Sequence, residues 1–126
     1  MPRTQYPVLL GYNIPSEKVS TLQILCAREG AVYCAISPRH YLLPLTALPV
    51  AGTPTQPADS DVPSVFSEEM LLFKGFSDDS LMRFLQAYRD AGLPKVELKA
   101  TITPHNALWN SIELHEELVQ ERDALR

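Results

Sequence analysis

The same order of segments occurs twice along the chain, and this repetition limits the folds that it can adopt. Residues 7–12 and residues 70–73 are short apolar segments that read as buried strands, and each is followed by a serine that can cap a helix. A glycine ends each expected helix, 14 residues after the first serine and 15 after the second. Another apolar segment follows each glycine, so the pattern predicts two units of strand, helix and strand.

Both expected helices carry the signals of a helix start. Ser16 is followed by Glu17, and Ser77 is followed by two aspartates, which suit the positive N-terminal end of a helix. A third helix is expected after Asn110, because Asn110 and Glu113 fit a capping box. An old duplication would explain the two similar halves, and two helices that follow the same rules independently would explain them equally well.

A long connection joins the two units and occupies residues 38–67. Its first part, residues 41–52, is apolar but broken by prolines, and we expect it to lie against the core. Its second part, residues 53–64, is rich in Pro, Ser, Thr and Asp, and this composition is typical of a mobile surface loop.

We expect one α/β domain over residues 1–126, with the first unit in residues 1–37 and the second unit and the last helix in residues 68–126. The first three strands are apolar on both faces, as in sheets that are covered on both sides. The last helix and residues 41–50 would supply the second cover. Right-handed crossovers would make this four-stranded sheet parallel. The alternative is a ferredoxin-like α+β sandwich, in which the strands pair antiparallel.

Composition argues against two classes of partner. The formal net charge is −4, and no Lys or Arg occurs between Arg39 and Lys74, so we expect no nucleic-acid partner. No segment approaches the roughly 18 apolar residues of a membrane span, and the first residues do not resemble a signal peptide. We therefore expect a cytoplasmic protein without a membrane partner.

Motifs for cofactor or metal chemistry do not occur in the sequence. It contains no phosphate-binding loop, no glycine-rich dinucleotide fingerprint and no nucleophile elbow. His40, His105 and His115 form no short-spaced ligand pair with one another or with a cysteine. We expect no cofactor, no metal and no catalytic residues. Cys26 and Cys34 show no Cys-x-x-Cys spacing and are expected to be small buried residues.

Residues 98–110 (LKATITPHNALWN) hold the most reactive-looking group of side chains. Strand alternation places Lys99, Thr101 and Thr103 on one face, which we expect to be solvated, as on an edge strand. Thr103 precedes a proline that ends the strand, and Asn106 suits a turn. Structural roles in the strand and the turn therefore explain most of the residues in this segment.

The same segment contains the candidate ligand site. In an open parallel sheet, ligands bind beyond the carboxyl ends of the strands, where the turn after residue 103 would meet residues 12–13 and 74–75. There a lysine could hold an anion and a histidine could transfer protons. The predicted ligand-binding residues are Lys99, Thr103, His105 and Asn106.

A non-catalytic domain that binds a partner protein or a small molecule is the first function that we expect. A homodimer fits this expectation, because the apolar connection could cover a neighbouring subunit. One alternative is a small enzyme with a site around Lys99, His105 and Asn106. The other is a scaffold protein that uses the acidic face of the last helix at Glu116 and Glu117.

Three motifs in the second half of the chain occur together in a known family. They are Gly-Phe-Ser after a strand, at 75–77; Ala-Gly at the end of a helix, at 91–92; and Lys-x-x-x-Thr-x-x-Asn-x-x-Trp, at 99–109. With these motifs, residues 70–118 resemble the bacterial domain-of-unknown-function family 3783, whereas the first half resembles it only in pattern. The resemblance implies a bacterial, soluble protein and brings no activity, substrate or catalytic residue.

Overall fold

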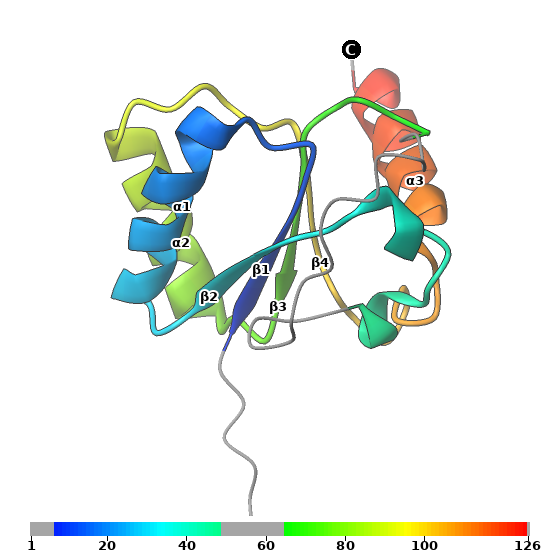
Figure 1. The fold of residues 1–126 in the computed structure, drawn as a ribbon, viewed down its shortest axis with the longest axis horizontal. Coiled ribbons are helices and arrows are strands. Elements are labelled where there is room, and N and C mark those ends of the chain that lie inside the picture. Colours follow the sequence, from blue (N-terminus) through cyan, green and yellow to red (C-terminus); the bar gives the residue numbers. More distant parts are fainter. Residues whose placement is uncertain (1–6, 49–64, 126) are drawn as a thin grey trace, which may run out of the picture.

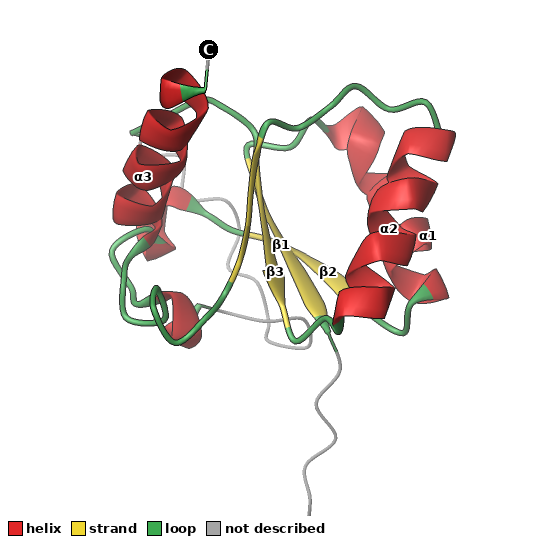
Figure 2. Ribbon diagram, turned by 180° about the vertical axis from the view of Figure 1, so that it is seen from behind, coloured by secondary structure: helices red, strands yellow, loops and turns green. Residues whose placement is uncertain are grey.

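A computed structural model describes residues 7–48 and 65–125, and it contains a four-stranded sheet between two layers (Figure 1). Helices α1 and α2 lie side by side on one face, and α3 lies on the other (Figures 1 and 2). The expected mobile loop, residues 53–64, falls outside the described residues. The elements are β1 (Val8–Tyr12), α1 (Ser16–Arg28), β2 (Val32–Ala35), the 3-10 helices η1 (Pro38–His40) and η2 (Leu45–Ala47), β3 (Met70–Lys74), α2 (Asp78–Asp90), β4 (Leu98–Thr101) and α3 (Ser111–Ala124).

The predicted helix signals are confirmed at every end but one. Ser77 and Asn110 cap α2 and α3, and each side chain accepts a hydrogen bond from the backbone amide three residues later. The two glycines predicted to end α1 and α2 have φ angles of 69° and 75°, a left-handed conformation that glycine adopts without strain. Ser16 is not a cap. It is the first residue of α1, and Pro15 precedes it without a side-chain hydrogen bond.

The four strands form a mixed sheet in the order β2-β1-β3-β4. Strands β1 and β2 are parallel, as are β3 and β4, so each predicted unit has the expected parallel pair. The central pair, β1 and β3, is antiparallel, with Leu10 opposite Leu72. This order and these directions are those that a twofold axis normal to the sheet at Leu10 and Leu72 would produce.

The predicted parallel sheet is therefore wrong at its centre. The end of β2 lies beside the end of β1, and Met70 at the start of β3 pairs with Tyr12 at that same end. The connection thus begins and finishes at one end of the sheet, which makes β3 run opposite to β1. The ferredoxin-like alternative also differs from the structure, because its strands all pair antiparallel.

The predicted cover on both faces is confirmed, and it creates two cores. The α1–α2 core contains Leu9, Leu22, Leu71, Phe73 and Phe84, together with other buried side chains. The α3 core lies on the opposite face of the sheet, and its central residues are Leu10, Tyr12, Tyr41, Leu45, Leu72 and Leu114.

The two cysteines are buried, as predicted, but in different cores. Cys26 belongs to the α1–α2 core and Cys34 to the α3 core, so the sheet separates them and they form no disulfide. Burial raises the pKa of the Cys26 thiol to about 12, which keeps it protonated and unreactive.

No helix in the described ranges, 7–48 and 65–125, is both long and apolar enough to cross a membrane.

Candidate functional site

Asn106 closes the turn that follows β4. The residue is 8 % exposed, and its Oδ1 accepts a hydrogen bond from the Thr103 amide at 2.8 Å. Its Nδ2 donates to the Thr101 carbonyl at 3.0 Å. Both ends of the amide are therefore engaged with the backbone, which gives Asn106 a structural role.

His105 and Lys99 do not meet. His105 is exposed, and its ring lies edge-on to Trp109, which packs against the α3 core, with 5.2 Å between the ring centroids. Lys99 lies on the other face of the sheet, opposite Leu71 in the register, among side chains of α2. The geometry for a shared catalytic site of Lys99 and His105 is therefore absent.

The predicted meeting of strand ends is confirmed for β3 and β4 and is wrong for β1. The turn after β4 lies beside the end of β3, where the Ile102 amide donates to the Phe73 carbonyl at 2.9 Å. Because β1 and β3 are antiparallel, Asn13 at the end of β1 lies beside the start of β3, where its Nδ2 donates to the carbonyl oxygens of Phe66 and Glu68 at 2.9 and 3.0 Å. The turn after β4 is at the opposite end of the sheet. A ligand-binding role of Thr103, His105 and Asn106 stays a prediction.

A hollow between α2 and β4, called here the α2–β4 pocket, contains Lys99. The sequence predicts a solvated face for this lysine, but that face looks toward α2 because β4 pairs with β3 beneath the helix. The volume is about 330 Å³, at the small end of the range of ligand pockets. The lining residues are Leu71, Phe84, Leu85, Tyr88, Arg89, Leu93, Lys95, Val96 and Lys99.

The lining of this pocket combines apolar side chains with three cations. Leu71, Phe84 and Val96 are at most 3 % exposed and belong to the α1–α2 core. Arg89 lies near the end of α2, and Lys95 and Lys99 flank the start of β4. The described lining residues include no carboxylate.

Lys99 is half-buried, and its Nζ donates a hydrogen bond to the Val96 carbonyl at 2.7 Å. Burial lowers the pKa of this amine, and the positive charges of Lys95 and Arg89 lower it further, while Glu97 opposes them. The pocket therefore holds an ammonium group that would gain from a neighbouring anion.

The loop that contributes Leu93, Lys95 and Val96 to one wall of the pocket is held by two further donors. The Tyr88 hydroxyl and Lys18 Nζ both donate to the Pro94 carbonyl, at 2.5 and 3.4 Å. Lys18, on α1, is 7 % exposed and forms an ion pair with Glu69 at 2.7 Å. Burial is the largest single effect and lowers the pKa of Lys18, but the hydrogen bond to Glu69 and the interactions with Tyr88 and the Glu69 charge together outweigh it, so the net pKa is raised. The pocket wall is thus attached to both helices of this layer.

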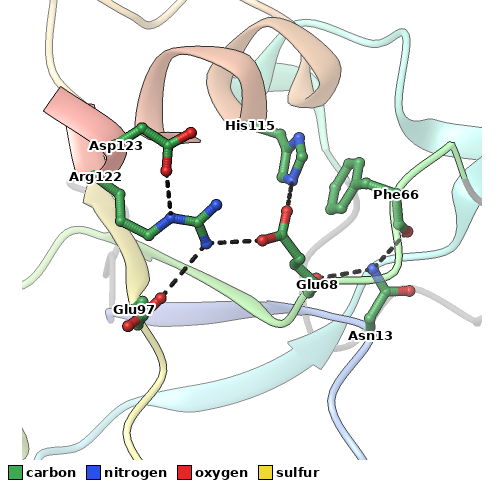
Figure 3. Close-up of polar contacts among 7 residues, drawn as sticks. All are labelled: Asn13, Phe66, Glu68, Glu97, His115, Arg122 and Asp123. Carbon is green, nitrogen blue, oxygen red and sulfur yellow. Dashed lines mark hydrogen bonds and ion pairs between the residues drawn. The ribbon is translucent and has the colours of Figure 1, made fainter. Parts of the chain in front are cut away.

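A second polar group joins α3 to the sheet, as Figure 3 shows. The Glu68 carboxylate contacts His115 Nε2 at 2.8 Å and accepts from Arg122 Nη1 at 2.7 Å. Phe66 stacks on the His115 ring, with 3.9 Å between centroids. Arg122 also lies 3.5 Å from Glu97. These charges are paired with one another, so the group fixes α3 in place.

No sequence pattern predicted the contacts of Glu68, or the donation from Tyr88 and Lys18 to the Pro94 carbonyl. Glu68 is 47 residues from His115 and 54 from Arg122, and Lys18 is 51 from Glu69, so no local spacing marks these contacts. The run Lys95-x-x-x-Lys99 after an amphipathic helix was the available signal for the pocket. In the parts of the chain that the structure describes, no group of three or more His, Cys, Asp or Glu side chains is placed to hold a metal ion.

Comparison with known proteins places the pocket within a family segment. Residues 69–125 match the model of a family described as a domain of unknown function (DUF3783), and all residues that line the α2–β4 pocket lie within this range. Comparison with curated proteins found no match, and comparison with solved structures found none either. The family match confirms what the sequence motifs predict: the second half of the chain is similar to the domain of unknown function DUF3783.

Proposed function

We propose that the protein is a non-catalytic domain that binds a small apolar molecule with one anionic group in the α2–β4 pocket. The observation that carries this proposal is the apolar hollow with Arg89, Lys95 and Lys99 in its lining. An alkyl chain or an aromatic ring would cover Leu71 and Phe84 and be removed from water. Its anionic group would accept charge-assisted hydrogen bonds from the cations.

Charge supports an anion as the ligand. The chain carries a formal net charge of −4, yet the described lining of this pocket carries three positive groups. Attraction between charges is stronger in a partly desolvated hollow than in water. An anion next to Lys99 would also offset the desolvation that lowers the pKa of its amine.

Octanoate and octanol form a matched pair of probes, because they share the alkyl chain and differ in charge. Calorimetry at neutral pH should show tighter binding of octanoate than of octanol. Lys99→Met keeps the apolar stem, and it should weaken octanoate binding about tenfold or more, which corresponds to one charged hydrogen bond. Lys74→Met removes a lysine outside the pocket lining and should leave both affinities unchanged.

Two results would contradict the proposal. One is an equal affinity for octanoate and octanol, which would show that the cations do not recognise charge. The other is an equal loss for Lys99→Met and Lys74→Met, which would show only a general effect of net charge. Leu85→Trp tests the location, since a larger side chain in the pocket lining should weaken the binding of both probes.

We also propose that the protein is a homodimer. Leu42 and Leu108 are 74 % and 82 % exposed, and backbone bonds from Leu45 to Trp109 and from Thr46 to Ala107 bring their segments together. An apolar surface of this kind favours burial against a second copy. Light scattering should give twice the 14.1 kDa monomer mass, and Leu108→Glu should halve it. A mass of 14.1 kDa at all concentrations would contradict the dimer.

Location in a bacterial cytoplasm stays a prediction from the sequence.

A further inference from the structure

Lys99 differs from Lys18 and Lys95 in what surrounds its amine. Lys18 is bound to the Glu69 carboxylate at 2.7 Å, and Lys95 is exposed. The Lys99 amine lies in an apolar pocket beside two cations and donates to an uncharged carbonyl, that of Val96. A neutral amine can keep this hydrogen bond through one N–H and still present its lone pair to the pocket.

We infer that Lys99 forms a reversible imine with an apolar aldehyde or ketone that carries an anionic group. This inference rests on the proposed function, because Arg89 and Lys95 would hold the anion while the apolar walls hold the remainder of the ligand. Lysines become nucleophilic when an apolar pocket or a neighbouring cation favours the neutral amine, and both conditions occur here.

The reaction needs no reagent beyond the amine and the carbonyl compound. The Nζ lone pair adds to the carbonyl carbon, a C–N bond forms, and the carbonyl electron pair moves to oxygen, which takes a proton from water. Nitrogen then loses a proton to solvent, and the carbinolamine loses water as the C=N bond forms. One water is released for each imine, no electron is transferred, and hydrolysis reverses the step.

Anion binding and imine formation have opposite pH dependences. Anion binding uses the protonated amine and weakens as the pH rises through the pKa of Lys99. Attack on a carbonyl uses the neutral amine and becomes faster over the same range. Because the pKa of Lys99 is lowered, the midpoint of this rise in rate should lie below pH 10.5, the ordinary pKa of lysine.

The experiment uses 4-formylbenzoate, which carries an aldehyde and a carboxylate on one ring, with cyanoborohydride to trap the imine. Digestion and mass spectrometry then report the rate of modification at each of the four lysines. Lys99 should react at least ten times faster than Lys74. The unreactive 4-methylbenzoate should bind and slow the reaction at Lys99 alone. Lys99→Arg should abolish the fast reaction and still bind 4-methylbenzoate.

The two proposals fail in different ways. If 4-methylbenzoate binds but Lys99 reacts no faster than Lys74, the imine is overturned and the binding site stands. If 4-methylbenzoate does not bind, the proposed function is overturned. The inference that Lys99 forms an imine with an anionic apolar carbonyl compound is then overturned as well.

Discussion

Gly11, on β1, lets the side chain of Tyr33 lie directly against the backbone of the neighbouring strand. A Cβ atom at residue 11 would lie 2.3 Å from the hydroxyl oxygen of Tyr33 and 2.7 Å from its ring. Gly11→Ala should displace that ring and lower the free energy of unfolding by about 1–3 kcal/mol, as measured in urea. In a Tyr33→Ala background, Gly11→Ala should lower the free energy of unfolding by less, because the tyrosine ring that clashes with the new Cβ atom is absent. An equal cost in both backgrounds would contradict this explanation.

Substitution of Asn106 can distinguish a structural role of the predicted site from a role in ligand binding. Asn106→Ala leaves the Thr103 amide and the Thr101 carbonyl without this partner, so the free energy of unfolding should fall by about 1–3 kcal/mol. His105→Ala changes an exposed neighbour in the same turn and should cost less than about 0.5 kcal/mol. Neither change should alter octanoate affinity. Loss of that affinity in Asn106→Ala, with stability retained, would move the binding site to the turn.

Helix α3 is joined to the segment before β3 through one carboxylate, that of Glu68. Hydrogen bonds from Arg122 and then His115 hold the pKa of Glu68 below its ordinary value of 4.5. A carboxyl with a lowered pKa contributes stability above its unfolded pKa and loses it as the pH falls through the folded pKa. Glu68 is 40 % exposed, so solvent screening limits the contribution to less than about 1 kcal/mol.

Glu68→Gln should therefore lower the free energy of unfolding at pH 7, and this penalty should become smaller at about pH 2.5, because the native carboxyl takes up its proton as the pH falls through its folded pKa. Urea unfolding at the two pH values measures the difference. Glu116→Gln removes an exposed carboxylate of α3 itself and should have little effect at either pH. A Glu68→Gln penalty of the same size at both pH values would indicate lost packing and contradict the electrostatic role.

Elements were predictable from the sequence where their signals are local. The caps at Ser77 and Asn110 use donors three residues away, and the apolar periodicity defines each strand and helix. The direction of β3 was not predictable, because it depends on where a connection of more than thirty residues returns to the sheet. The prediction that Lys99 lies on a solvated face was wrong for the same reason. Strand alternation shows which side chains of β4 share a face, but the neighbouring elements decide which face is covered.

At the scale of the whole molecule, two similar units share one sheet. Neither unit can bury its apolar surface alone. Strand β1 pairs with β3 over five residues and contributes to both cores. The family segment, residues 69–125, contains β3 and β4 but neither β1 nor α1. A fragment of residues 65–126 would therefore expose Leu71 and Phe73 on one face of β3 and Leu72 on the other.

We expect this fragment to be largely unfolded by circular dichroism and to regain structure when a separate fragment of residues 1–48 is added. Recovery follows because pairing of β1 with β3 restores both cores at once, and burial of apolar surface is the main favourable contribution to folding. A first fragment with Leu10→Asp places a charge in the α3 core and should not restore the structure. Cooperative unfolding of residues 65–126 alone would show instead that the family segment folds independently. In that case β1 and α1 would only increase its stability.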